Sequence, residues 1–429
     1  MTAGQVFFTM ALTVTSIMLF RWSFQRDRML GLIVAASLVL RLLGALMFTW
    51  YLEAQGREFF ADDEMGYLGA GQLIVEGWQR NVQYEMEEGV RAVVLGGYAY
   101  WNALLVWVCG PSLLPMRLAN GVVGAAGAIL AFLLSECFFP NKTAHRAAAL
   151  LVGLSPSLVV WSLTNLRETF LAVLALATVL SGVSIIKTWG WVRFGSFLGC
   201  LMLLGSLRIY YAALLGWLSL GMYSFLSSAS LRYKVLLLVP VTLSIGLALQ
   251  TVTGSFLAMD TTTETLARHI MQTDDGSDSE VEYLTFPPDL GDLGELIVRL
   301  PAVLFGRFDS RAGVGLLMSI FLFPEWLATF AILPLAYWGL INAIRQRRYE
   351  SLLPAAYVCV MVLVLAWTHG DPWTTYRHRA TYWPFVLVLA GGGISLALRA
   401  RTSRSPSLID TATAHPQKGR HRYFGSRSS

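Results

Sequence analysis

Residues 59–77 of the chain read FFADDEMGYLGAGQLIVEG, with three consecutive carboxylates inside a segment that is otherwise mostly apolar. At helical spacing Asp63 and Tyr67 share one face with the small and apolar positions Ala70 and Ile74. An acidic side chain then lies one turn from an aromatic one. The stretch is either a polar loop or an active site, and the rest of the chain has to decide between them.

The composition of the whole chain is that of a membrane protein. Of 429 residues 55% are hydrophobic and 14% are charged, and the mean hydropathy is +0.56. Such a chain is too apolar for a soluble globular protein. Its apolar runs are continuous rather than alternating, and backbone polar groups must be paired in lipid, so the spans are expected to be helices. The sequence therefore predicts an all-α, polytopic transmembrane bundle.

Cysteine usage and charge exclude several other classes. The four cysteines stand singly within apolar runs, a pattern that indicates no zinc site, redox motif or disulfide framework. The net charge of +5 is accompanied by no nucleic-acid-binding motif, and in a membrane chain Lys and Arg collect in cytoplasmic loops. No nucleic-acid partner is therefore expected.

The basic clusters give the orientation of the spans. When each cluster is placed in the cytoplasm, the chain crosses the cell membrane about eleven times, with its N-terminus outside and its C-terminus inside. The first apolar run lacks a basic n-region and a cleavage site, so it is a span rather than a signal peptide. The predicted spans are residues 5–20, 29–51, 117–138, 147–162, 169–186, 194–207, 211–228, 234–252, 324–342, 353–368 and 381–398.

Two long segments are predicted outside the cytoplasm, residues 52–116 and the acidic loop 253–311. Within the first, Ala92–Gly110 is apolar, but a crossing there would place every later basic cluster outside. We therefore expect an interfacial or re-entrant helix. Residues 1–398 then form one transmembrane domain, and the basic tail 399–429 is expected to be disordered in the cytoplasm.

Ionisable residues at the outer membrane face are costly and tend to have a function. Besides the acidic stretch they include Arg117, Arg208, Glu168 next to Arg167, and several residues between His369 and Arg379. Arg377 and Arg379 run against the positive-inside tendency and so require an anion. Lipid headgroups, the acidic loops of the protein and the phosphate of a bound lipid remain open as that anion.

A carboxylate beside a basic pocket at membrane level suits transfer of a group from a lipid phosphate to a hydroxyl. The carboxylate takes the proton of the acceptor, and cationic side chains stabilise the phosphate as it leaves. This step requires no metal, although Asp63 and Glu168 could hold a divalent cation through oxygen ligands. The structural alternatives are a helix cap for Asp63 and a local ion pair with Arg167 for Glu168. Nucleotide-binding, zinc-protease and serine-hydrolase motifs are absent from the sequence.

Four short motifs follow one another between residues 58 and 398. They are Asp63-Glu64-x-x-Tyr67-x-x-Ala70-x-x-Leu73; Arg117-Leu118-Ala119-Asn120 before a Gly/Ala-rich span; Leu154-Ser155-Pro156 ahead of Glu168; and Tyr376-Arg377-His378-Arg379 with Pro384-Phe385. As an ordered set they resemble the C-type glycosyltransferases of membranes. The resemblance is to the bacterial branch related to dolichyl-phosphate-mannose protein mannosyltransferases and the lipid A aminoarabinose transferase.

The resemblance implies a polyprenyl-phosphate-linked sugar as donor and a hydroxyl of a glycan, lipid or protein as acceptor. It also implies an inverting transfer on the extracytoplasmic face with Asp63 as base. The chain departs from the family in its extra first span and in lacking the large C-terminal soluble domain of some relatives. The residues expected at the site are Asp63, Glu64 and Glu168 for catalysis; Arg377, Arg379, Arg208 and Arg117 for the donor phosphate; and Asp62, Tyr67 and His369 for the acceptor or sugar.

Two other readings remain. The chain could be a translocase of lipid-linked sugars, or a polymerase or ligase of surface glycans with a diphosphate-linked donor. A translocase requires polar side chains through the bilayer midplane, whereas the charges singled out above gather at the outer rim. A scaffold role in envelope assembly is the reading that applies if the carboxylates are inert.

Overall fold

The computed structural model describes residues 2–80, 96–226, 299–301, 303–305, 316–368 and 372–404. Within these ranges all regular structure is helical, which confirms the all-α prediction. The elements are α1 Ala3–Arg26, α2 Arg28–Ala54, α3 Asp62–Arg80, α5 Gly97–Cys109, α6 Leu113–Phe138, α7 Lys142–Leu154, α8 Pro156–Ser162, α9 Glu168–Lys187, α10 Trp191–Leu207, α11 Ile209–Leu226, α15 Leu316–Arg345, the 3-10 turn η1 Tyr349–Ser351, α16 Leu352–Thr368 and α17 Pro372–Arg404.

Among the described residues, eight helices are long and apolar enough to cross a membrane, and the bent pair of α7 and α8 makes a ninth candidate. Every predicted span that falls on described residues coincides with one of these or with α10, an apolar helix of 17 residues. The predicted span 234–252 and nearly all of the loop 253–311 lie outside the described residues. The protein is therefore a multi-pass helical membrane protein.

The predicted span 147–162 is broken rather than continuous. Its two halves, α7 and α8, meet at an angle of 48°. Pro156 begins α8, and Ser155 before it has ψ 123°, outside the helical region. A proline has no N–H to donate and disfavours helical geometry in the residue before it, which accounts for the break at this point.

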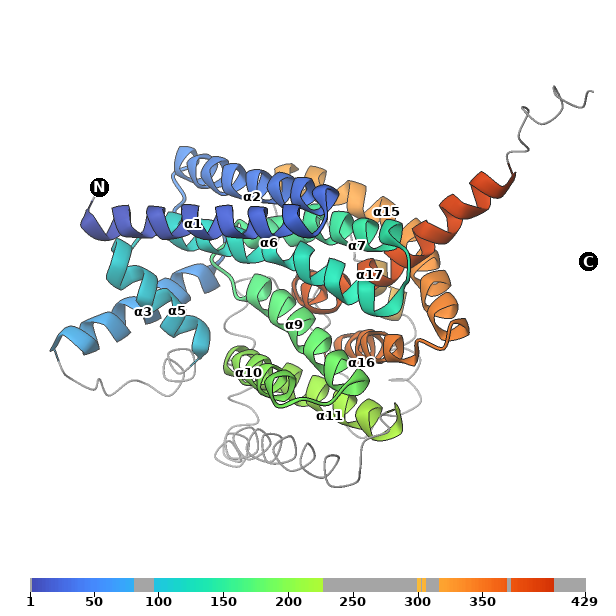
Figure 1. Ribbon diagram of the computed structural model, residues 1–429. Coiled ribbons are helices and arrows are strands. Elements are labelled where there is room, and N and C mark those ends of the chain that lie inside the picture. The colour runs from blue at the N-terminus through green and yellow to red at the C-terminus, as the bar shows by residue number, and fades with distance from the viewer. Residues whose placement is uncertain are drawn as a thin grey trace, which may run out of the picture.

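The first long loop contains two helices that pack on each other. Leu68 and Ile74 of α3 share a buried cluster with Ala103 and Val106 of α5, and Figure 1 shows the two helices at the end of the bundle that holds the N-terminus. α5 has 13 residues, which at about 1.5 Å per residue span roughly 20 Å, less than the roughly 30 Å hydrocarbon core. The length of α5 is in keeping with the predicted interfacial or re-entrant position, which stays a prediction.

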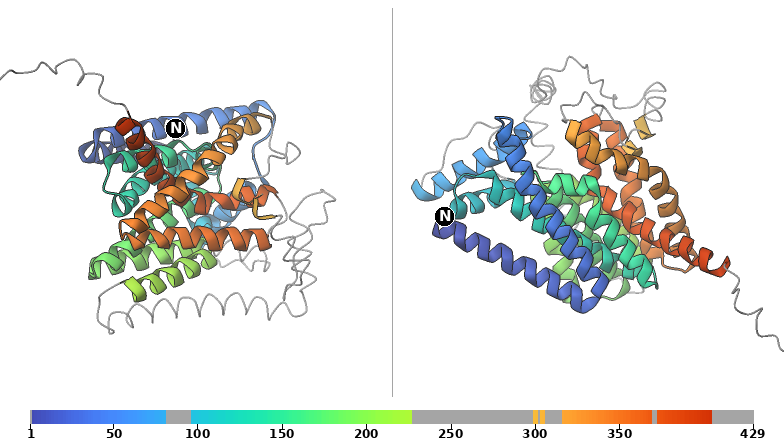
Figure 2. Two further views of the ribbon diagram at one scale, coloured as in Figure 1. Left: turned by 90° about the vertical axis from the view of Figure 1, so that its right-hand side faces the viewer. Right: turned by 90° about the horizontal axis from the view of Figure 1, so that it is seen from above.

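The last helix, α17, is the centre of the bundle. Of its most apolar window 78% is buried inside the protein, against none for α1, which lies at the edge of the bundle in Figure 2. Three consecutive glycines, residues 391–393, allow the neighbours to approach this closely. A Cβ on Gly391 would lie 2.7 Å from the backbone nitrogen of Ala148 in α7, and one on Gly393 would overlap the backbone of Leu335 in α15.

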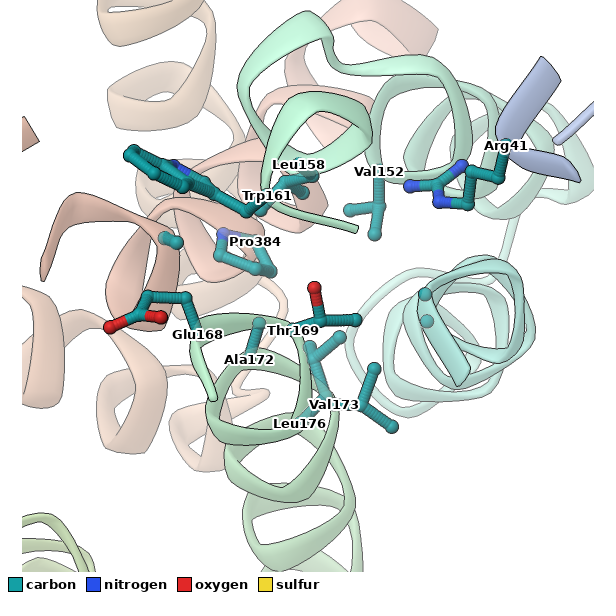
Figure 3. A pocket seen from close by; sticks show the side chains of 13 residues that line it. Arg41, Val152, Leu158, Trp161, Glu168, Thr169, Ala172, Val173, Leu176 and Pro384 are labelled. Carbon is teal, nitrogen blue, oxygen red and sulfur yellow. The ribbon is translucent and has the colours of Figure 1, made fainter. Parts of the chain in front are cut away.

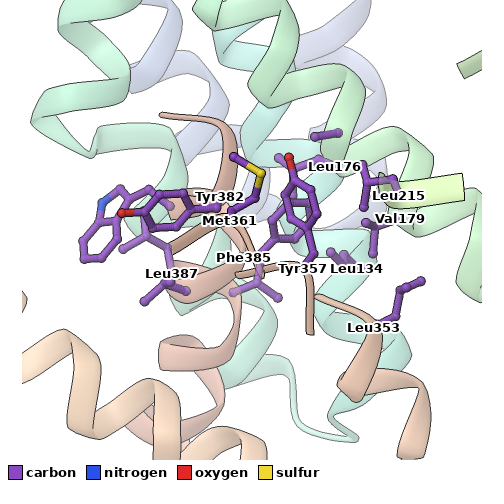
Figure 4. Close-up of a cluster of buried hydrophobic side chains, with 14 of the residues drawn as sticks. Leu134, Leu176, Val179, Leu215, Leu353, Tyr357, Met361, Tyr382, Phe385 and Leu387 are labelled. Atoms are coloured by element: carbon purple, nitrogen blue, oxygen red, sulfur yellow. The ribbon is translucent and has the colours of Figure 1, made fainter. Parts of the chain in front are cut away.

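Aromatic side chains fill the core around α17. Phe385 of α17 meets Tyr357 of α16, with their rings 5.4 Å apart in an edge-on contact, and Tyr382 of α17 belongs to the same buried cluster. Leu176 of α9 and Leu215 of α11 complete the cluster in Figure 4, and all five are buried. Packing of this density fixes α17 along its length and so places its first turns, which carry Arg377.

Candidate active site

One guanidinium joins two of the carboxylates that the sequence predicts to be catalytic. Arg377, in the first turns of α17, donates a hydrogen bond from Nη1 to Asp63 Oδ2 and one of 2.5 Å from Nε to Glu168 Oε1. These partners are 314 and 209 residues away along the chain. The structure therefore brings Asp63 of α3, Glu168 of α9 and Arg377 of α17 together.

The two carboxylates differ in their access to solvent. The side chain of Asp63 is 50% exposed, whereas that of Glu168 is fully buried and that of Arg377 is 14% exposed. A group that must meet a substrate has to be reachable, and in this trio only Asp63 is open to that extent. Glu168 is in position to hold Arg377 rather than to contact a ligand.

Two more arginines flank this trio. The guanidinium of Arg167, the residue before α9, lies 5.7 Å from the ring centre of Tyr67. Arg208, between α10 and α11, donates to Tyr210 Oη at 2.9 Å, and its guanidinium lies over the ring of Tyr210. Tyr67, which was expected to face acceptor or sugar, is 7% exposed. Its buried ring packs against the guanidinium of Arg167.

The arginines keep Asp63 ionised. Burial of the carboxyl group raises the pKa of Asp63, but the positive charges of Arg377, Arg167 and Arg208 outweigh this effect and hold the pKa below its ordinary value of 3.8. Asp63 is therefore a carboxylate at neutral pH, the protonation state that a general base requires. While Arg377 is bound to it, however, it is a weak base.

Glu64 and Arg117 form a separate, buried ion pair. Their side chains are 0% and 1% exposed, and Arg117 Nη2 donates to Glu64 Oε2 at 2.9 Å. The same carboxylate accepts from the backbone N–H groups of Phe60 and Asn165, at 2.7 and 2.5 Å. Successive residues on a helix point about 100° apart, so Glu64 faces inward where Asp63 faces out. The expectation that Glu64 is catalytic and Arg117 binds phosphate does not match this geometry, which makes them an anchor for α3.

A network of buried amides, which the sequence reasoning missed, orients the loop before α9. Asn165 donates from Nδ2 to Asn102 Oδ1 at 2.8 Å and accepts from Tyr98 Oη at 2.9 Å. Asn120 donates to Tyr98 Oη at 2.9 Å and to the carbonyl of Thr164 at 2.7 Å. The available signal was an asparagine inside an apolar run, since a buried amide must find partners. The network links α5 and α6 to the loop that carries Arg167 and Glu168.

Arg379 lies apart from Arg377, although the two are only two residues apart in α17. Its guanidinium is 3.6 Å from the ring centre of Trp383, and Nη2 donates to Thr329 Oγ1 of α15 at 3.0 Å. The side chain is 1% exposed. The expectation that Arg379 binds the donor phosphate is not met by this position, because two residues along a helix rotate a side chain by about 200°.

Three predicted features have another outcome. His369 lies outside the described residues, and Asp62 begins α3 but its side chain is not among those described. Among the described residues no group of three or more His, Cys, Asp or Glu side chains could hold a metal ion. Between Asp63 and Glu168, where a divalent cation was an open alternative, the structure has the guanidinium of Arg377.

Comparison with known proteins adds evidence on the fold. No family model and no curated protein sequence matches the chain. The solved structure of the archaeal oligosaccharyltransferase AglB from Archaeoglobus fulgidus, in complex with an inhibitory peptide and a dolichol-phosphate, is similar, with a TM-score of 0.50 and 13% identity. The chain shares its overall fold with that protein. The likeness covers 92% of this chain and 53% of that one, so the chain spans about half the length of AglB. At this identity the likeness shows the fold, and the bacterial branch suggested by the sequence motifs stays a prediction.

Proposed function

We propose that the protein is a membrane glycosyltransferase that moves a sugar from a polyprenyl-phosphate donor to a hydroxyl acceptor with inversion. The observation that carries the proposal is the half-exposed, ionised Asp63 bound to Arg377. The similar fold of an oligosaccharyltransferase whose structure contains a dolichol-phosphate supports it. Following the basic loops, we place the site on the extracytoplasmic face of the cell membrane.

The charge of the site suits a phosphate. Three guanidinium groups, those of Arg377, Arg167 and Arg208, act on two carboxylates, those of Asp63 and Glu168. Among the described side chains of the site one positive charge is in excess, and a lipid phosphate supplies the missing negative charge. Of the arginines predicted for the donor, the proposal keeps Arg377 and Arg208, adds Arg167, and leaves Arg117 and Arg379 as structural residues.

In the proposed reaction, Asp63 Oδ accepts the proton of the acceptor hydroxyl as its oxygen attacks the anomeric carbon of the sugar. The bond between that carbon and the phosphate oxygen breaks, and its electron pair stays on the phosphate. The arginines stabilise the negative charge that develops there. Attack opposite the leaving phosphate inverts the anomeric centre.

Arg377 couples donor binding to the strength of the base. In the structure it donates to Asp63, which lowers the basicity of this carboxylate. A donor phosphate that accepts a hydrogen bond from Arg377 weakens that contact and makes Asp63 a stronger base. The base is then activated only when the donor is present.

The test is Asp63→Asn, assayed in membranes supplied with a polyprenyl-phosphate sugar and a hydroxyl acceptor. We expect the rate of transfer to fall by about 10²- to 10⁴-fold, the usual contribution of a general base. The matched control is Asp27→Asn. Asp27 lies between α1 and α2 and forms an ion pair with Arg146 of α7; asparagine removes its charge and keeps a residue that can cap α2. Transfer at the wild-type rate in Asp63→Asn would disprove Asp63 as the base.

A further inference from the structure

Arg41 is a buried cation that the proposed reaction does not use. It lies in the middle of α2, a span of 27 residues, and is 1% exposed. Its Nη1 donates to Ser37 Oγ and to the carbonyl of Gly153, both at 2.5 Å. Within the described part of the chain no carboxylate is paired with it, and its Nε has no protein hydrogen-bond partner. A charge at this depth is costly, so its presence calls for a role.

A cavity of about 20 Å³ lies between Arg41 and the start of α9, and Figure 3 shows it from close by. The guanidinium of Arg41 reaches it from one side, and the hydroxyl of Thr169 points into it from the other. Thr169 Oγ1 is buried and also has no protein partner among the described residues. Glu168 lines the far end, with its carboxylate directed away from Arg41.

The surroundings are shaped to admit the guanidinium. Gly124 of α6 lines the cavity, and a Cβ there would lie 2.7 Å from Arg41 Nε and 3.1 Å from Ser162 Cβ. Any larger residue at this position would therefore push Arg41 out of place. The volume suits one water molecule, which needs about 10–15 Å³ by the same measure and two to four polar partners.

We propose that one water molecule in this cavity joins Arg41 Nε to Thr169 Oγ1, and that Arg41 thereby acts as a positioning residue for Glu168. The Nε–H group donates to the water oxygen, and the water donates to the Thr169 hydroxyl. This bridge fixes the first turn of α9, in which Glu168 precedes Thr169 directly. Glu168 in turn holds Arg377 against Asp63. The inference rests on the proposed function in one respect, that the carboxylate so placed belongs to the transfer site.

The bridge is tested by a double-mutant cycle on the purified full-length protein in lipid nanodiscs, with melting temperature as the readout. Arg41→Gln and Thr169→Val each remove one partner of the water. We expect the double variant to lose less than the sum of the two single losses, by about 2 °C or more. Should Arg41→Gln not yield folded protein, Arg41→Lys replaces it, because Lys also lacks Nε.

Thr178→Val is the matched control. Thr178 lies in the same helix, is buried, and donates to the Leu174 carbonyl, but it does not line the cavity. Its cycle with Arg41→Gln should be additive. An additive cycle between Arg41 and Thr169 overturns the inference whatever the activity of the protein.

Kinetics separate this role from a purely structural one. Thr169→Val should lower kcat by about tenfold or more through misplacement of Glu168, with KM for the donor unchanged because the phosphate-binding arginines are intact. Thr178→Val should alter neither constant. A wild-type protein that transfers no sugar contradicts the proposed function and leaves the cycle valid, whereas unchanged kcat in Thr169→Val contradicts the positioning role alone.

Discussion

Arg377→Gln is the substitution with the clearest expected cost. It removes the guanidinium that pairs with Asp63 and Glu168 at once and leaves a shorter, neutral side chain. The two carboxylates should respond differently because their surroundings differ. The free energy of unfolding therefore tests how much each of the two ion pairs contributes to stability.

The cost can be worked out from the exposure of each partner. Glu168 is fully buried, and removing one partner of a buried ion pair costs about 3–5 kcal/mol, because the other charge stays buried and unpaired. The side chain of Asp63 is 50% exposed, and water screens such a pair, so its share is about 0.2–1 kcal/mol. Nearly all of the expected loss thus comes from Glu168.

The assay is reversible denaturant unfolding of Arg377→Gln, alone and combined with Glu168→Gln or with Asp63→Asn. Adding Glu168→Gln should restore most of the lost stability, since it removes the unpaired buried charge, while Asp63→Asn should restore little. The matched control is Arg26→Gln, whose partner Glu136 and own side chain are 28% and 52% exposed; its cost should stay within about 0–1 kcal/mol.

Sugar transfer gives the second readout. Arg377→Gln with Glu168→Gln should remain about 10²- to 10³-fold slower than wild type even where stability returns, because the phosphate has lost a donor. Arg377→Gln with Asp63→Asn should be slower still, because the base is removed as well. The reasoning is refuted if Asp63→Asn restores as much stability as Glu168→Gln, or if neither does. Either result would mean that Glu168 does not carry the buried charge of the site.

Three further outcomes are expected. The pKa of Asp63 in the folded state is below its ordinary value of 3.8, so ionisation of Asp63 stabilises the fold above that pH. This contribution is lost as the pH falls through the lowered pKa. The melting temperatures of wild type and Asp63→Asn should therefore converge below about pH 4. Removal of divalent cations with a chelator should leave transfer unchanged, since Arg377 occupies the position between the carboxylates, and loss of activity restored by Mg²⁺ or Mn²⁺ would contradict this. Gly391→Ala should destabilise the protein by about 1–3 kcal/mol through overlap with Ala148, measured by the same unfolding assay.

The sequence could predict the spans, and that the charged residues of the site lie close together, for one reason. A bilayer demands long apolar helices and a partner for each charge, so span ends that carry unmatched charges have to meet. The acidic stretch, Glu168 and Arg377 were singled out on this ground, the spacing to Tyr67 and the family resemblance then favoured Asp63, and the structure joins Asp63, Glu168 and Arg377. Ser155-Pro156 was quoted only as a motif, although a proline inside a predicted span already indicated the break between α7 and α8.

The sequence could not predict in which direction each side chain points. Asp62, Asp63 and Glu64 together cover about 200° of a helix, so they cannot all face one site. Which of them points inward depends on which buried partner is present, and for Glu64 this partner is Arg117, 53 residues away in the sequence. Arg41 was missed because a single arginine in a strongly apolar run hardly changes the hydropathy of the span.

The same membrane physics explains why one carboxylate is left open. Glu64 and Glu168 are fully buried, and each is held by an arginine that is itself at most 14% exposed. Burial of a charge in this setting is tolerated only with such a partner. Asp63 shares its arginine with Glu168 and keeps half of its own surface free. A purely structural carboxylate gains nothing from that exposure, since screening by water weakens its ion pair. An acceptor hydroxyl, by contrast, can reach Asp63 without displacing any of the described helices, which is the condition that the proposed base has to meet.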